Sequence, residues 1–139
     1  MREDAIINGK SILREYGLKM VSFNITPPTP KTEIIEIPYS NIYYDVSEIF
    51  GEVTYKPRTI TMVFRLITDI NCWHTKIDAL VNDLHGKKVE IKLLSDGEWS
   101  YNGRCEVTIA TKDSYYDSSI TISALVEPYK TNSKGDKKL

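Results

Sequence analysis

The stretch TITMVFRLI, residues 59–67, decides the fold class of this chain. Large apolar side chains occupy every second position, and polar or smaller residues lie between them. The residues on one face are Ile60, Met62, Phe64 and Leu66, and those on the other are Thr59, Thr61, Val63, Arg65 and Ile67. A period of two is that of a β-strand with one face in the core, so we predict a long strand here.

Weaker patterns of the same kind lie on both sides of this stretch. The predicted strands cover residues 19–26, 33–37, 52–58, 89–94, 99–112 and 120–127. Three prolines make residues 27–32 a stiff loop, and residues 38–52 are predicted to be irregular. Turns are expected at 95–98 and 114–119, with a bulge or kink at Asn102-Gly103. The chain therefore belongs to the mostly β class, as a β-sandwich or small barrel of about seven strands.

One helix is expected, over residues 72–85. Its apolar residues recur at helical spacing and form one stripe, which consists of Trp73, Ile77, Leu80, Val81 and Leu84. Asn71 is a candidate N-cap, and Gly86 is a candidate residue for the position after the helix. We expect this helix to pack on the sheet.

The same stretch contains Cys72, His74, Asp78 and His85, which together raise the possibility of a metal or catalytic site. At a rise of about 1.5 Å per residue, Asp78 and His85 lie about 10 Å apart along the helix axis. One zinc ion, with ligand bonds of about 2.1 Å, does not bridge that distance. We therefore predict a packing helix with no metal, no cofactor and no catalytic residue.

Composition sets the remaining limits. The chain has 139 residues, 18 basic and 19 acidic, and a net charge of −1, so no bulk attraction to nucleic acid or lipid is expected. We predict one domain over residues 1–130 and a polar, disordered tail over 131–139. No segment has the length of a membrane span. Both cysteines are expected to be free thiols, although spacing alone does not decide whether Cys72 and Cys105 pair.

Five motifs in order resemble the ring-forming N-terminal domain of the distal tail (Dit-like) proteins of long-tailed bacteriophages and prophages. An acidic turn and a GxxxYxxRxI pattern precede the long strand, a Trp-led helix ends in Leu-x-Gly, and YxGR and PYK follow. The residues that carry the resemblance are Asp45, Gly51, Tyr55, Arg58, Ile60, Trp73, Leu84, Gly86, Tyr101, Gly103, Arg104, Pro128, Tyr129 and Lys130. These residues are structural rather than catalytic in that family.

The resemblance implies a non-enzymatic virion protein that is assembled in the bacterial host cytoplasm. Six copies would form a ring in the baseplate, between the tail tube protein and the tail-associated hub protein, with receptor-binding proteins as further partners. DNA would pass through the lumen without specific binding, and no membrane or cofactor is implied.

Two other interpretations stay open at this point. The first is a tail tube or tube-terminator subunit, whose domains also combine a sandwich with one helix. The second is a small monomeric β-sandwich that binds sugar or peptide through Trp99, Tyr101 and Arg104.

Overall fold

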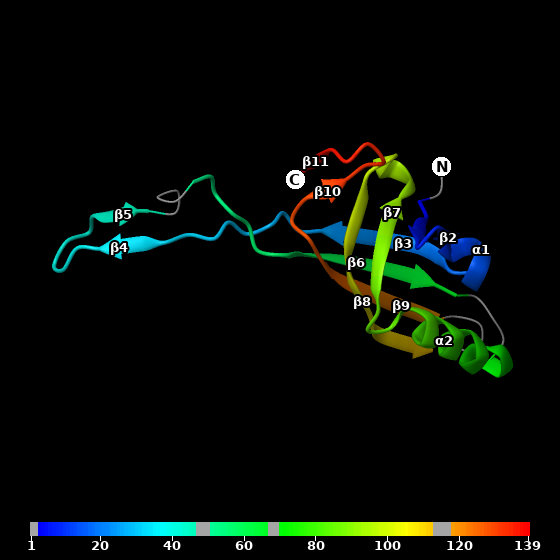
Figure 1. Ribbon diagram of the computed structural model, residues 1–139. Coiled ribbons are helices and arrows are strands. Elements are labelled where there is room, and N and C mark those ends of the chain that lie inside the picture. Colours follow the sequence, from blue (N-terminus) through cyan, green and yellow to red (C-terminus); the bar gives the residue numbers. More distant parts are fainter. Residues whose placement is uncertain (1–2, 47–50, 67–69, 113–117) are drawn as a thin grey trace.

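The computed structural model describes residues 3–46, 51–66, 70–112 and 118–139, and it confirms a mostly β fold with one long helix (Figure 1). Antiparallel pairs build a nine-stranded sheet: seven strands follow the order β2-β1-β7-β8-β9-β6-β3, and β10, beside β8, and β11, beside β10, complete it. A separate two-stranded sheet consists of β4 and β5. The strands are β1 (Ala5–Ile7), β2 (Lys10–Ser11), β3 (Lys19–Ile25), β4 (Ile34–Glu36), β5 (Tyr43–Asp45), β6 (Arg58–Arg65), β7 (Lys88–Leu93), β8 (Ser100–Lys112), β9 (Ser118–Val126), β10 (Lys130–Thr131) and β11 (Lys137–Lys138).

The large sheet folds over along β8. The first residues of this long strand pair with β7, from Ser100 to Arg104, whereas its later residues pair with β9, from Gly103 to Lys112. Figure 1 shows β7 and the start of β8 crossing in front of β3 and β6. The two layers of the predicted sandwich are therefore parts of one continuous sheet, with a single core cluster between them.

One face of strand β6 lies in that core, as its periodicity predicts. The side chains of Ile60, Met62 and Phe64 are completely buried. Each one faces a buried partner on β9, because the antiparallel register places Ala124, Ile122 and Ile120 directly opposite. Burial of large apolar side chains contributes about 1.5–3 kcal/mol each, so these facing residues make a substantial contribution to stability.

Helix α2 spans Ile70–Leu84 and confirms the predicted packing helix. Trp73, Leu80 and Leu84 are buried in the core. The predicted N-cap is wrong, because the helix begins one residue before Asn71. Gly86 has a φ of 75°, the left-handed conformation expected of a residue just beyond a helix.

A second, shorter helix was not expected from the sequence. Helix α1 spans Ile12–Tyr16 and is capped by Ser11, whose hydroxyl accepts a hydrogen bond from the Arg14 amide. The hydroxyl of Tyr16 donates to a carboxylate oxygen of Asp83 at 2.7 Å, which connects α1 to α2. Burial and this carboxylate raise the pKa of Tyr16 to about 12.

Residues 26–57, here called the arm, differ most from the prediction. They leave the body between β3 and β6 and extend away from it as a two-stranded ribbon that ends in β4 and β5 (Figure 1). The segment predicted to be irregular contains β5. The predicted strand at 52–58 makes one isolated bridge, between Tyr55 and Pro30, and only its last residue, Arg58, belongs to a strand, β6. Prolines on both sides of the ribbon lack the amide hydrogen that a regular ladder needs. Part of the predicted irregular segment, residues 47–50, lies outside the described residues, as does most of the turn predicted at 114–119.

The C-terminal segment also differs from the prediction. Residues expected to be disordered form the hairpin of β10 and β11, in which Thr131 pairs with Ser100 of β8. The amides of Lys134 and Asp136 donate to the side-chain oxygen of Asn132, which closes the turn between the two strands. The ammonium of Lys138 lies 4.3 Å from the centre of the Trp99 ring. A polar hairpin is ordered here because its partners come from a distant part of the chain.

The predicted bulge at Asn102-Gly103 is absent, because both residues keep regular register with β7. The bulge in β8 lies instead between Val107 and Ile109. Gly103 has a different reason to be glycine. A Cβ at this position would lie 2.5 Å from the Val126 Cα and even closer to the Leu125 carbonyl oxygen.

We expect Gly103→Ala to lower the free energy of unfolding by about 3 kcal/mol or more, because β8 and β9 must separate to admit the methyl group. Urea denaturation of the variant and the wild type measures this difference. Gly97→Ala is the control, since no atom lies within 4 Å of its added Cβ and only its positive φ opposes the change. It should cost about 1–2 kcal/mol, the cost of a Cβ at positive φ. Equal losses in the two variants would contradict the steric explanation.

Candidate functional site: the Arg58 cluster and the arm

The helix residues that suggested a metal site have ordinary structural surroundings. Within the described part of the chain, no three His, Cys, Asp or Glu side chains are grouped to hold a metal ion. His85 supports the end of the helix, where its Nδ1 accepts a hydrogen bond from the Val107 amide at 3.0 Å. Cys72 is exposed on α2, whereas Cys105 is completely buried in β8. Burial raises the pKa of the Cys105 thiol to about 11.

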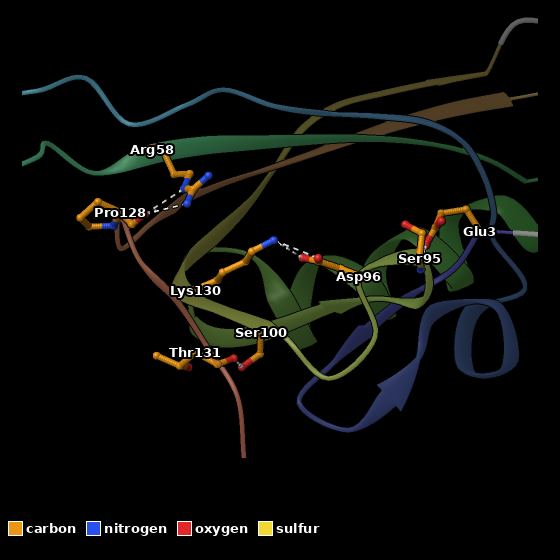
Figure 2. A network of polar contacts seen from close by, with 8 residues as sticks. All are labelled: Glu3, Arg58, Ser95, Asp96, Ser100, Pro128, Lys130 and Thr131. Atoms are coloured by element: carbon orange, nitrogen blue, oxygen red, sulfur yellow. Dashed lines mark hydrogen bonds and ion pairs between the residues drawn. The ribbon is translucent and has the colours of Figure 1, made fainter. Parts of the chain in front are cut away.

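A buried arginine forms the centre of a polar cluster. Arg58, the first residue of β6, is only 7% exposed. Its Nε and Nη2 donate to the Pro128 carbonyl oxygen at 3.2 and 2.7 Å, as Figure 2 shows. Its guanidinium carbon lies 5.3 Å from the centre of the Tyr101 ring. A carbonyl oxygen and an aromatic face thus compensate the buried charge.

The other side of the cluster contains an ion pair. The Lys130 ammonium lies 2.9 Å from one oxygen of Asp96 (Figure 2). It also lies 5.8 Å from the centre of the Tyr101 ring. Tyr101 therefore lies near two cations and one carboxylate. Burial is the main cause that raises the pKa of Tyr101, and the negative charge of Asp96 raises it further. The phenol therefore stays neutral. The Ser100 hydroxyl donates to the Thr131 carbonyl at 3.2 Å. This hydrogen bond holds Thr131, the residue after Lys130, against β8.

The base of the arm joins this cluster through two tyrosines. Tyr55 and Tyr129 pack edge to face, with ring centres 6.0 Å apart. Residues of three predicted motifs thus meet at one place, although 70 positions separate Arg58 from Pro128. The residues that we call the Arg58 cluster are Tyr55, Arg58, Asp96, Tyr101, Pro128, Tyr129 and Lys130.

The remaining residues of the resemblance lie elsewhere. Arg104 donates from Nη1 to the Gly86 carbonyl at 2.6 Å, which connects β8 to the end of α2. Trp73, Leu84 and Ile60 are core residues, and Gly103 permits close approach of β8 and β9. Asp45 lies on β5 and Gly51 beyond it, both in the arm and exposed. These residues therefore do not form one site with the Arg58 cluster.

The structure removes the aromatic surface on which the sugar- or peptide-binding interpretation depends. Tyr101 is only 2% exposed, because it is enclosed in the Arg58 cluster. Trp99 is half-buried and carries the Lys138 ammonium on its ring. Tyr101 is therefore a core residue, and it is not available to stack on a ligand.

The arm presents six of the thirteen exposed large apolar side chains of the described chain. Tyr43 and Tyr44 are each 60% exposed, and Tyr39 has a relative exposure of 110%, the value of a side chain that touches almost nothing. The other exposed apolar residues of the arm are Ile34, Ile35 and Ile42. The sequence signal for this surface is the run of isoleucines and tyrosines between residues 34 and 44, which has no alternation of buried and exposed positions.

Comparison with solved structures confirms the fold that the resemblance predicts. The chain is similar to the Dit protein (gp 19.1) of phage SPP1, which is described as a paradigm of the hub adsorption apparatus in Gram-positive infecting phages. The TM-score is 0.72 at 13% sequence identity, over 95% of this chain. The chain spans about half, 53%, of the length of that protein. No protein-family model matches the chain, and no curated protein sequence matches it.

The structure has no helix, within its described residues, that is long and apolar enough to cross a membrane.

The two thiols should react at very different rates with a disulfide reagent at pH 8. We expect Cys72 to react at once, because it is exposed on α2. Cys105 should react only after unfolding, since it is buried and its thiolate is disfavoured at a pKa of about 11. Absorbance titration with and without denaturant measures both thiols, and Cys72→Ser is the control that removes the fast phase. Two fast thiols in the native protein would contradict the placement of Cys105.

Arg58→Met should release the C-terminal segment from the body. It removes two charge-assisted hydrogen bonds to Pro128, so we expect a loss of about 2–3 kcal/mol in the free energy of unfolding. Amide hydrogen exchange should accelerate most in residues 127–132. Arg14→Met, on the exposed face of α1, is the matched control and should change stability by less than about 0.5 kcal/mol. Unchanged exchange in residues 127–132 would show that Arg58 does not hold this segment.

Proposed function

We propose that this chain is a non-enzymatic structural component of the tail tip, or baseplate, of a long-tailed phage or prophage. Six copies close into a ring that joins the tail tube protein to the tail-associated hub protein and the receptor-binding proteins. The ring assembles in the host cytoplasm and belongs to the virion tail. The shared fold with SPP1 Dit supports this proposal, and the arm is the observation that carries it.

The arm has the physical properties of an assembly element. An isolated two-stranded ribbon is marginally stable in water, and this one, which has two strands among the described residues, exposes isoleucines and tyrosines. Contiguous exposed apolar surface of this kind marks a protein–protein contact. Tyrosine is also enriched at the centres of such contacts. A partner that covers the ribbon would remove its apolar side chains from water and order its backbone.

The arm is also compatible with a ring. It projects from one side of the body, and the surface that receives it must lie elsewhere on the next copy (Figure 1). Such head-to-tail contacts use two different patches and close into rings when the rotation between copies permits. A ring that conducts DNA should not retain it, which agrees with a net charge of −1 and with passage of DNA without specific binding.

Shortening the arm should abolish assembly and leave the body folded. The Lys31 amide donates to the Thr54 carbonyl at 2.8 Å, so these two residues face each other across the ribbon. Replacement of residues 32–53 by Asn-Gly, a favoured two-residue hairpin turn, removes the apolar part of the arm and keeps its base. We expect a monomer with a melting temperature within a few degrees of the wild type and association at least about 100-fold weaker.

Light scattering after size exclusion, across a concentration series, measures the assembly, and electron microscopy identifies its form. Closed six-fold rings of the wild type support the proposal. Open-ended tubes would assign the chain to the tail tube instead. A wild type that remains monomeric at every concentration, or a shortened variant that still forms rings, would overturn the role proposed for the arm.

A further inference from the structure

The tip of the arm has a tyrosine in a position that suits glycine. Residues 37–40 form a turn in which the Ser40 amide donates to the Ile37 carbonyl at 3.2 Å. Pro38 occupies the second position, and Tyr39 the third with a φ of +61°. This is the pattern of a type II turn, whose third residue is ordinarily glycine or asparagine because side chains with a Cβ avoid positive φ.

No contact within the chain explains why Tyr39 is tyrosine. The described structure gives Tyr39 a relative exposure of 110%, with no hydrogen bond or ring contact to the rest of the chain. A residue that strains the backbone and contributes nothing to its own fold is the kind of outlier that indicates a function. Tyr39 forms part of the lining of an open depression of about 740 Å³ at the tip, which has apolar residues such as Ile34 and Ile42 and polar residues such as Glu36 and Asn41.

We propose that Tyr39 is the anchor by which the arm of one copy binds the body of a second copy of this chain. This inference rests on the proposed ring and names the residue that determines its contact. Tyr39 projects from the tip and enters the neighbouring body. The depression that it lines receives side chains of the same neighbour. Large aromatic side chains at the centre of an interface contribute most of its binding energy.

Charge favours a second copy as the occupant. The arm, residues 26–57, has two lysines and five acidic residues, a net charge of −3. Residues 1–25 and 58–139 have 16 basic and 14 acidic residues, a net charge of +2. The body of every copy is therefore complementary in sign to the arm of the next, which speeds and orients their encounter.

Length favours the same occupant. At about 3.3 Å per residue, the thirteen residues from Thr26 to Tyr39 extend over about 43 Å. A body of this size is roughly 30–35 Å across. An arm laid along an adjacent copy therefore brings Tyr39 to the far side of that copy. Contact along this whole length covers the exposed isoleucines and tyrosines of the ribbon.

The test compares Tyr39→Gly, Tyr39→Asn and Tyr39→Phe in the full chain. Glycine and asparagine both accept the positive φ and remove the ring, whereas phenylalanine keeps the ring and the strain. We expect ring formation by the glycine and asparagine variants to be at least tenfold weaker in sedimentation equilibrium. Their melting temperatures should equal or exceed that of the wild type, and Tyr39→Phe should still assemble.

Four results would overturn this inference. Normal assembly of Tyr39→Gly, together with loss of assembly when residues 32–53 are replaced, would exclude Tyr39 and leave the ring proposal standing. A wild type that stays monomeric at every concentration would overturn both the role of Tyr39 and the ring proposal. A fall in the melting temperature of Tyr39→Gly would show that the tyrosine supports its own chain. Normal rings of Tyr39→Gly that no longer capture the purified tail tube or hub protein would assign the tip to that protein instead.

Discussion

The contact between the Arg58 guanidinium and the Pro128 carbonyl is the constraint on which the arrangement of the other parts depends. A buried cation must be compensated, and here the carbonyl oxygen and the Tyr101 ring do so. Because Arg58 begins β6 where the arm ends, the same contact fixes the return of the arm to the body. Because Pro128 follows β9, it also fixes the direction in which the chain leaves the sheet. Lys130 and its ion pair with Asp96 then guide that segment along β8.

The parts that were predictable from sequence are those whose burial is regular. The alternation of residues 59–67 reports a strand with one face in a core, and the stripe of α2 reports a helix on the same core. The arm has no such regularity, because both faces of β4 and β5 are exposed. The period-two signal requires one buried face, so it cannot detect an exposed ribbon. The C-terminal hairpin escaped prediction for another reason, since its order comes from Ser100, Asp96 and Trp99, about 30 residues earlier in the sequence.

The candidate site was predictable only in part. The motif residues were identified one by one, and several of them meet in the Arg58 cluster, which no periodicity could indicate. Pairing of Tyr55 with Tyr129 and of Arg58 with Pro128 depends on the folded sheet. Residues that would contact partners are a different set. Tyr39 draws attention only when its backbone conformation and exposure are known, because a Pro-Tyr dipeptide is unremarkable in sequence.

The junction between the base of the arm and the end of β9 has a mechanical consequence. In the proposed ring, a copy that is held by its neighbours through the arm would carry tension at this point. In this chain, the Arg58–Val126 pair joins the start of β6, where the arm ends, to the end of β9, where the C-terminal segment begins. The Arg58 and Tyr55 contacts reinforce this junction, because they hold the base of the arm to Pro128 and Tyr129. Tension between the arm and the C-terminal segment would therefore be borne at this junction rather than along the full length of β6 and β9.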